Sequence, residues 1–124
     1  MRAVGASLGA KTLLHLATLA PSRVSAMVHA SATPRFNEAT REVVRAAGAP
    51  VDMSFGPDVL SKIDARTLIV HGDRDELYPV ELAVELYRGI PRARLCVVPT
   101  GKHGVAFERA SGFERQVLAF FADA

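Results

Sequence analysis

A serine between two glycines near the start of the chain constrains its fold more than any other feature. Residues 5–9 read GASLG and match the pattern G-x-S-x-G. This pattern is typical of a sharp turn from a strand into a helix, where the serine backbone is strained and the residues two positions before and after it must be small. Apolar residues 1–4 and a helix expected over residues 11–20 supply that context. Such a turn exposes the Ser7 hydroxyl and places the Leu8 N–H at a helix N-terminus, where it can stabilise an oxyanion.

Segments that predict strands alternate with segments that predict helices along the rest of the chain. Strands are expected at residues 24–30, 66–71 and 94–98, and helices at residues 37–47, 58–62, 79–89 and 113–121. This alternation predicts an α/β fold with about four parallel strands and flanking crossover helices. In the 37–47 helix, Val43 and Val44 form the stripe that we expect to face the core. The length of 124 residues predicts a single domain, residues 1–124.

A nucleophilic serine needs a base, and the base needs an acid that orients it. Asp75 follows the 66–71 strand, and His103 lies in a glycine-flanked loop after the 94–98 strand. Side chains that follow parallel strands collect at the carboxyl edge of the sheet, and the chain order Ser, Asp, His is the one associated with this type of serine turn. These positions predict that Ser7, Asp75 and His103 act together.

Other residues near the strand ends leave alternatives open. Asp73 lies in the same loop as Asp75 and is an alternative acid. His29 and His71 stand at strand ends, where either can be a structural histidine that lines the site, and His15 falls within the first helix and is assigned to the core. The four histidines and thirteen acidic residues show no metal-ligand spacing such as H-E-x-x-H, so we predict no metal site.

Three segments, in this order, resemble the serine hydrolase branch of the α/β-hydrolase family. Residues 5–10 resemble its nucleophile elbow, residues 67–75 with Pro79 its acid-bearing strand and loop, and residues 101–108 its histidine loop. In the family pattern the second aspartate of G-D-x-D is the acid, which favours Asp75. The resemblance implies hydrolysis of an ester, thioester or amide bond of a small-molecule carbonyl substrate through an acyl-enzyme on Ser7. It also implies Leu8 N–H as an oxyanion donor, and no cofactor.

The chain departs from the family pattern in three places. Family members carry further strands before the elbow, so the resemblance covers the C-terminal part of the fold, with the N-terminal strands missing. A cap-like insert, about residues 33–64, is short and favours an open pocket. Lys102 lies beside the expected base, where a positive charge lowers the pKa of a histidine. An unpaired apolar sheet edge also leaves open a non-catalytic remnant that self-associates through this edge.

The composition limits which binding partners and which cellular compartment we expect for this chain. Lys and Arg are scattered along the chain and the net charge is +2, so nucleic acid is not an expected partner. No stretch approaches the ~18 apolar residues that a membrane span requires. Lys11 and His15 interrupt the first apolar stretch, which argues against a secretion signal. The single cysteine, Cys96, permits a reducing compartment, and we expect a cytoplasmic protein with Cys96 as a buried hydrophobe.

Overall fold

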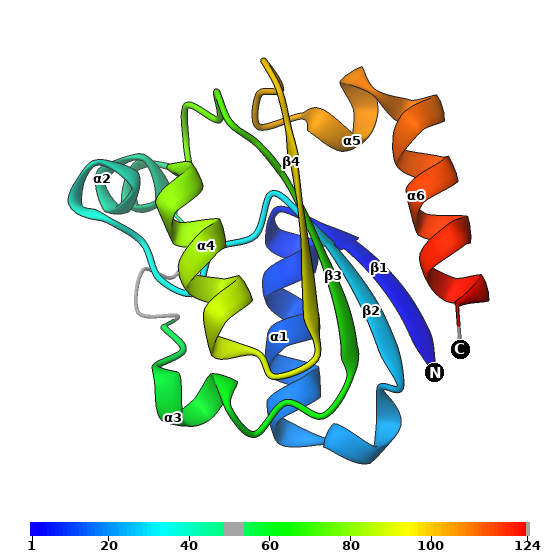
Figure 1. Ribbon diagram of the computed structural model, residues 1–124. Helices are drawn as coiled ribbons and strands as arrows, with labels where there is room; N and C mark the ends of the chain where they lie inside the picture. Colours follow the sequence, from blue (N-terminus) through cyan, green and yellow to red (C-terminus); the bar gives the residue numbers. More distant parts are fainter. Residues whose placement is uncertain (49–53, 124) are drawn as a thin grey trace.

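Four parallel strands form one sheet at the centre of the molecule, in the order β1-β2-β3-β4 (Figure 1). The structure is a computed structural model and describes residues 1–48 and 54–123. The strands are β1 (Arg2–Ala6), β2 (Ala26–Ala30), β3 (Arg66–Gly72) and β4 (Ala93–Val98). Each strand pairs in parallel with the next along the chain. The α/β class with four parallel strands is therefore confirmed.

Helices cover both faces of this sheet. Helices α1 (Leu8–Leu19) and α4 (Val80–Gly89) lie on one face, and α6 (Ala110–Ala122) lies on the other (Figure 1). The shorter elements are the 3₁₀ helix η1 (Pro21–Arg23), α2 (Glu38–Ala46), α3 (Pro57–Leu60) and α5 (Val105–Glu108). Helices on both sides of a parallel sheet follow from crossover connections between its strands, because each connection must pack on one face.

Two apolar cores lie on the two faces of the sheet, because successive side chains of a strand point to opposite faces. One core, next to α1 and α4, contains Leu14, Met27 and Ile69, each 0% exposed. The other, next to α6, contains Val70 and Phe120. The central strands are buried on both faces and so read as continuous apolar runs rather than as alternating ones.

Several helix boundaries differ from those predicted. Helix α1 begins at Leu8, earlier than predicted, because the serine turn leads directly into it. Asn37 caps α2, and its side chain accepts a hydrogen bond from Thr40 N at 2.8 Å. The prediction that Val43 faces the core is wrong, since its side chain is 51% exposed. The buried residue of α2 is Thr40, whose hydroxyl donates to Leu77 O, so this helix contacts the molecule at its first turn. Helix α5 was not predicted.

The expected cap-like insert, residues 33–64, carries α2 and α3. Its residues 49–53 lie outside the described residues. The two described parts are joined by a backbone hydrogen bond from Phe55 N to Pro34 O at 2.8 Å. Phe55 and Leu60 are buried in the core next to α1 and α4. The described part of the insert therefore packs against the sheet domain, and its assignment as a cap stays a prediction.

Strand β1 lies at one edge of the sheet. Within the described residues it pairs with β2 alone. A groove of about 360 Å³ lies beside it, and its lining is mainly apolar: Val4, Phe113, Glu114, Val117 and Leu118. Val4 is 48% exposed and Leu118 69% exposed. Apolar surface is thus open along this edge of the fold.

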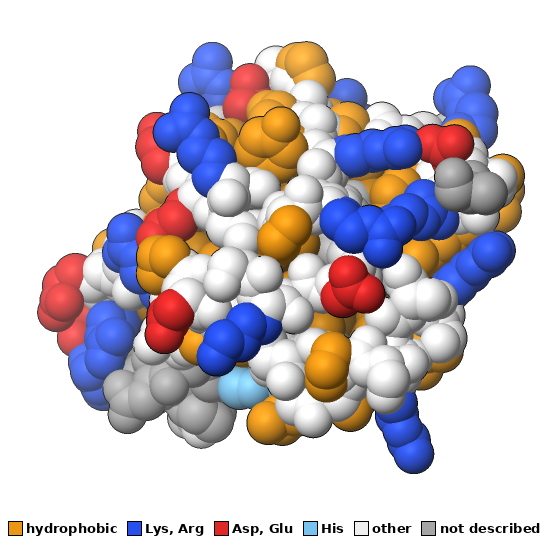
Figure 2. All heavy atoms as spheres, turned by 60° about the horizontal axis from the view of Figure 1, so that its bottom comes forward, with side chains coloured by type: hydrophobic (Ala, Val, Ile, Leu, Met, Phe, Trp, Pro, Cys, Tyr) orange, Lys and Arg blue, Asp and Glu red, His pale blue; other side chains and the backbone are white. Residues whose placement is uncertain are grey.

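The surface carries basic side chains in separate places. Figure 2 shows them distributed over one face, several beside acidic or apolar side chains. Some of the surface arginines form ion pairs with acidic side chains: Arg35 with Glu85 at 3.3 Å, Arg94 with Asp123 at 2.7 Å, and Arg45 with Glu42. No helix within the described ranges combines the length and apolarity needed to cross a bilayer. The expectation that nucleic acid is not a partner stays a prediction.

Candidate active site

The serine turn connects β1 to α1 at the carboxyl edge of the sheet. Ser7 has φ 53° and ψ −114°, a region in which a residue with a side chain is strained. Ser7 N donates to Ala30 O at 2.8 Å, and Lys11 N donates to Ser7 O at 3.2 Å. An added Cβ on Gly5 would lie 2.6 Å from Gly9 O, so a glycine is required for this close approach of strand and helix. Leu8 opens α1, and the first N–H groups of a helix lack intrahelical acceptors.

The prediction that Gly9 must also be small is wrong in steric terms. A Cβ added to Gly9 would meet no described atom within 4 Å. The backbone of Gly9 is the surface against which Gly5 packs, while its own Cβ direction points into open space. In this part of the chain the steric demand of the turn therefore falls on the first glycine of the motif.

The structure brings Ser7, His103 and Asp75 together. Ser7 Oγ lies 2.9 Å from His103 Nε2, and His103 Nδ1 lies 3.0 Å from Asp75 Oδ2. The other carboxylate oxygen, Asp75 Oδ1, accepts hydrogen bonds from Leu77 N at 2.8 Å and Tyr78 N at 2.7 Å. A carboxylate held in this way accepts a hydrogen bond from Nδ1–H, which keeps the proton on Nδ1 and leaves the lone pair of Nε2 directed at the serine.

The loops that carry Asp75 and His103 meet at two glycines. A Cβ added to Gly72 would lie 2.2 Å from Gly101 O and 2.3 Å from Gly101 C, so the two backbones touch at this point. Arg74 N also donates to Gly101 O at 2.9 Å. The glycine contact therefore sets the distance between the acid and the histidine.

Asp73, the alternative acid, lies at the same junction. Its Oδ1 accepts a hydrogen bond from Thr100 N at 2.7 Å, and its own N–H donates to Val98 O at 3.2 Å. Asp73 thus ties the two loops together, while Asp75 is the carboxylate that contacts His103.

The pKa values of the acid and the base move in opposite directions. The hydrogen bond from Asp75 raises the pKa of His103, burial opposes this rise, and the charges of Asp75 and Glu76 add to it. Burial acts to raise the pKa of Asp75, but hydrogen bonds with His103 and with the N–H groups of Tyr78 and Leu77 lower it below its usual value. The prediction that a neighbouring lysine lowers the pKa of His103 is wrong, because Lys102 is exposed and water screens its charge.

Two further histidines lie buried under the site. His29 Nε2 lies 3.2 Å from Met27 Sδ, and burial lowers the pKa of His29 to about 4, which keeps it uncharged. His71 Nε2 donates to Tyr78 O at 2.8 Å and lies 3.5 Å from Asp75 Oδ2. His71 therefore lies behind the acid loop and supports it.

Two residues that contact His103 were not predicted. Tyr78, directly before Pro79, is 6% exposed, and its ring meets the His103 ring edge-on at 4.9 Å between centroids. Phe36 packs on Tyr78 at 5.9 Å. Ser31, at φ 57°, donates its hydroxyl to His103 O. A large aromatic residue in the acid loop was a visible signal for Tyr78, whereas the contact of Ser31 joins segments far apart in the sequence.

Lys11 is buried one helical turn after Ser7, with 2% of its surface exposed. Its Nζ donates to Thr33 O at 3.4 Å and lies 3.9 Å from the centre of the Phe36 ring and 5.9 Å from that of Phe55. Burial lowers the pKa of Lys11 to about 8. Among the described residues, its ammonium group is therefore held by one long hydrogen bond and by aromatic rings, which compensate only in part for lost hydration.

We expect Lys11→Met to raise the free energy of unfolding by about 1–3 kcal/mol at neutral pH, because it removes a poorly compensated buried charge. The folded-state pKa, about 8, lies below the usual 10.5, so between these values the unfolded chain binds more protons and wild-type stability rises with pH. The variant lacks this rise. Urea denaturation at neutral pH and across that window measures both effects, with exposed Lys62→Met as the control. A Lys11→Met protein that is less stable at neutral pH contradicts this account.

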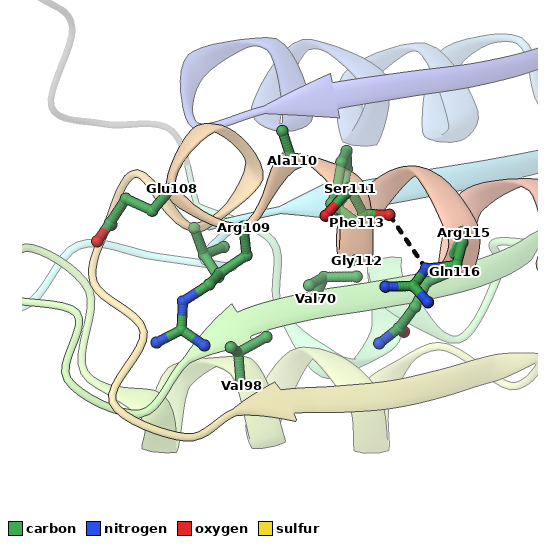
Figure 3. Close-up of a pocket in the computed structure, with 11 residues that line it drawn as sticks. Val70, Val98, Glu108, Arg109, Ala110, Ser111, Gly112, Phe113, Arg115 and Gln116 are labelled. Carbon is green, nitrogen blue, oxygen red and sulfur yellow. Dashed lines mark hydrogen bonds between the residues drawn. The ribbon is translucent and has the colours of Figure 1, made fainter.

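A separate pocket of about 380 Å³ lies between α5, the start of α6 and the ends of β3 and β4 (Figure 3). Its lining residues are Val70, Val98, Val105, Glu108, Arg109, Ala110, Ser111, Gly112, Phe113, Arg115 and Gln116. Arg109 Nη2 already donates to Thr100 Oγ1 at 3.0 Å, and Arg115 Nε to Ser111 O at 3.5 Å. Ser7, Asp75 and His103 do not line it, so it is distinct from the candidate site. The part of the chain that the structure describes holds no cluster of three His, Cys, Asp or Glu side chains suited to a metal ion.

No family model matches the chain. A 2-hydroxy-6-oxononadienedioate/2-hydroxy-6-oxononatrienedioate hydrolase from Pseudomonas putida is 39% identical over 61 residues, which are 49% of this chain and 21% of that protein. Carboxylesterase CesB from Bacillus subtilis superposes with a TM-score of 0.85 at 18% identity, over 99% of this chain and 60% of that chain. The meta-cleavage product hydrolase CumD from Pseudomonas fluorescens gives 0.83 at 19% identity, over 97% and 64%.

The chain spans less than two thirds of the length of each of these relatives and solved structures. Its alignments cover between 16% and 24% of the curated relatives' lengths. Among solved structures the shares of 60% and 64% are larger, and nearly all of this chain superposes. The structural likeness, at identities near 20%, establishes the fold.

Proposed function

The chain has the fold of the α/β-hydrolase family, in its C-terminal part, and from that premise we propose that it is a serine hydrolase with Ser7 as the nucleophile. The observation that carries the proposal is the continuous pair of hydrogen bonds from Ser7 Oγ to His103 Nε2 and from His103 Nδ1 to Asp75 Oδ2, at 2.9 and 3.0 Å. Such an arrangement gives a weakly acidic hydroxyl an acceptor for its proton at the moment of attack.

In the first half of the proposed reaction, Ser7 Oγ forms a bond to the carbonyl carbon and its proton passes to His103 Nε2. Asp75 stabilises the imidazolium and keeps its orientation. The Leu8 N–H donates to the carbonyl oxygen as negative charge develops there. The tetrahedral intermediate then expels the leaving group, which takes the proton from His103. The product of this half is an acyl-enzyme on Ser7.

In the second half, water bonds to the acyl carbon and gives a proton to His103 Nε2. The bond from carbon to Ser7 Oγ breaks, Oγ takes that proton, and the carboxylic acid leaves. Every step is an acyl or a proton transfer, so the reaction requires no cofactor. The proposed substrate is a small molecule with an ester, thioester or amide bond, in line with the naming of CesB as a carboxylesterase. The proposed compartment is the cytoplasm.

The test is covalent labelling, which does not depend on rapid turnover. We expect an activated ester, p-nitrophenyl acetate, to add an acetyl group to the peptide that contains Ser7, and Ser7→Ala to remove the adduct. Ser25→Ala is the matched control, since Ser25 is exposed and its hydroxyl donates to Met1 O at 3.0 Å. The labelling rate should rise with pH as His103 loses its proton, with a midpoint above the usual 6.5, because Asp75 raises this pKa.

Two results would count against the proposal. Labelling that persists in Ser7→Ala means that another side chain is the nucleophile. Labelling that spreads over exposed lysines, at a rate that does not change with pH in the range where a histidine titrates, means that His103 does not act as a base.

A further inference from the structure

Three arginine side chains lie around one cavity at the edge of the sheet where the strands begin. Arg66 begins β3, and Arg92 and Arg94 flank the first residue of β4. Since β3 and β4 are parallel, their starts share one edge, opposite to the edge that carries Ser7. The cavity has a volume of about 350 Å³ and is lined by Arg66, Arg92, Ala93, Arg94 and Phe120. Within the described part of the chain, the lining combines three positive charges with one aromatic ring and contains no acidic side chain.

The ring of Phe120 holds two of these guanidinium groups in place. Arg66 Cζ lies 4.8 Å from the ring centre and Arg94 Cζ lies 5.8 Å from it. Phe120 itself is fixed, because its side chain packs in the core next to α6 and is only 4% exposed. A guanidinium group over an aromatic face keeps the N–H groups at its rim available for hydrogen bonds. An anion that enters the cavity therefore meets donors that are already partly ordered.

The contacts that these arginines make within the chain leave most of their donors unused. Arg66 Nη1 donates to Phe120 O at 3.4 Å, and Arg92 Nη1 donates to Asp64 O at 3.2 Å. Arg94 Nη1 lies 2.7 Å from Asp123 Oδ2. All three contacts use Nη1, whereas a guanidinium group carries five N–H donors. Of the three acceptors only Asp123 Oδ2 belongs to a charged group, so the positive charge of the cluster exceeds that of its described partners.

The ion pair with Asp123 is one that a ligand can replace. Its two side chains are 59% and 52% exposed, and a pair so open to water contributes little to stability. Asp123 also does not line the cavity of the three arginines. Its carboxylate is therefore a competitor for Arg94 rather than a fixed part of the site.

The surplus charge and the shape of the cavity indicate the class of ligand. A phosphate ester carries a charge of about −1.5 to −2 at neutral pH and three oxygens that accept hydrogen bonds, so it can bind several guanidinium groups at once. A carboxylate has one charge and two oxygens, which suit a single arginine. A second cavity of about 370 Å³ shares Arg94 and Phe120 with the first, and Leu68 and Ala119 add apolar lining to it. The two cavities together have room for a phosphate group with an apolar remainder.

We propose that Arg66, Arg92 and Arg94 form a binding site for a phosphate ester that carries an apolar or aromatic group. The phosphate oxygens accept hydrogen bonds from the arginines, and the apolar group packs in the adjoining cavity. The site lies at the opposite edge of the sheet from Ser7, and it stands or falls independently of the proposed hydrolase activity.

The test is titration of the whole chain with phenyl phosphate, followed by calorimetry at low ionic strength. We expect Arg92→Gln and Arg94→Gln each to weaken binding by about 10-fold, the effect of a lost hydrogen bond to a charged group. Asp123→Asn should strengthen binding by a few-fold, because it removes the competing carboxylate. Arg45→Gln is the matched control, since it removes the same charge from an exposed arginine that pairs with Glu42 on α2.

Two further probes examine the ligand class. Benzoate has the same ring with a single charge, and we expect it to bind about 10-fold more weakly than phenyl phosphate. Vesicles of phosphatidylcholine with phosphatidic acid distinguish the two sources of a phosphate ester. Sedimentation with these vesicles that is lost in Arg92→Gln and Arg94→Gln assigns the site to a lipid headgroup. Binding of phenyl phosphate without sedimentation assigns it to a free phosphate ester.

The proposal is overturned if neither phenyl phosphate nor the vesicles bind, or if benzoate binds as tightly as phenyl phosphate. It is also overturned if Arg92→Gln and Arg94→Gln weaken binding no more than Arg45→Gln does. Asp123→Asn keeps the test independent of damage to the fold, because a disrupted site cannot bind more tightly. Unchanged or weaker binding in Asp123→Asn means that the ligand does not take the place of Asp123 at Arg94, and this result contradicts the proposed site.

Discussion

Asp75→Asn is expected to lower the rate at which Ser7 is acylated by roughly 10³–10⁴-fold, while Asp73→Asn leaves it nearly unchanged. The two aspartates lie in one loop, and the same substitution at each removes one negative charge. The difference arises from their contacts. Asp75 Oδ2 lies 3.0 Å from His103 Nδ1, whereas Asp73 Oδ1 accepts from Thr100 N.

The hydrogen bonds around residue 75 determine how an asparagine fits there. Oδ1 accepts from the N–H groups of Leu77 and Tyr78, so the amide oxygen must take this place and the NH₂ group must face His103. An NH₂ group opposite Nδ1 makes that nitrogen an acceptor, which moves the imidazole proton to Nε2. Ser7 then faces a nitrogen that cannot take its proton. At residue 73 an asparagine oxygen can still accept from Thr100 N.

The pH dependence provides a second readout for Asp75→Asn. Since the hydrogen bond and charge of Asp75 raise the pKa of His103, the variant should titrate at lower pH than wild type, as seen by NMR of the imidazole. Equal loss of acylation in Asp73→Asn and Asp75→Asn would show that the loop as a whole matters and not the carboxylate at His103.

Much of the fold and the three positions of the candidate site could be predicted from the sequence, because each depends on a local pattern. Strands that are buried on both faces read as apolar runs, and crossover helices lie between them. Ser7 is marked by Gly5, whose missing Cβ is a local demand of the turn. Asp75 and His103 each follow a strand end, and parallel strands place such positions at one edge.

The remaining features depend on contacts between segments far apart in the sequence. The choice between Asp73 and Asp75 is made by Thr100 and His103, which the sequence does not place relative to the acid loop. Lys11 interrupts an apolar stretch, and its burial depends on Phe36 and Thr33, which lie in a different segment. Helical periodicity predicts which side of a helix is apolar, but not whether a partner covers that side, and so the face of α2 was wrongly predicted.

The arrangement of the two loops that carry Asp75 and His103 depends on a contact between the backbones of Gly72 and Gly101. We therefore expect Gly72→Ala to lower the free energy of unfolding by about 2–4 kcal/mol. The added Cβ would lie 2.2 Å from Gly101 O and 2.3 Å from Gly101 C. Both are backbone atoms, so a rotamer change cannot relieve the overlap and the loops must separate. Separation lengthens the distance from Asp75 to His103, and we therefore expect acylation of Ser7 to fall together with stability.

Two further glycines make this a graded test by urea denaturation and Ser7 labelling. A Cβ on Gly101 would lie 3.1 Å from Gly72 Cα, a milder overlap, so Gly101→Ala should cost less than Gly72→Ala. A Cβ on Gly112, within α6, would meet nothing within 4 Å, and Gly112→Ala should stabilise the chain by about 0.5–1 kcal/mol through the better helix propensity of alanine. A Gly72→Ala protein that matches wild type in stability and in Ser7 labelling would contradict this account. It would show that the loops can separate without losing stability or the alignment of Asp75 with His103.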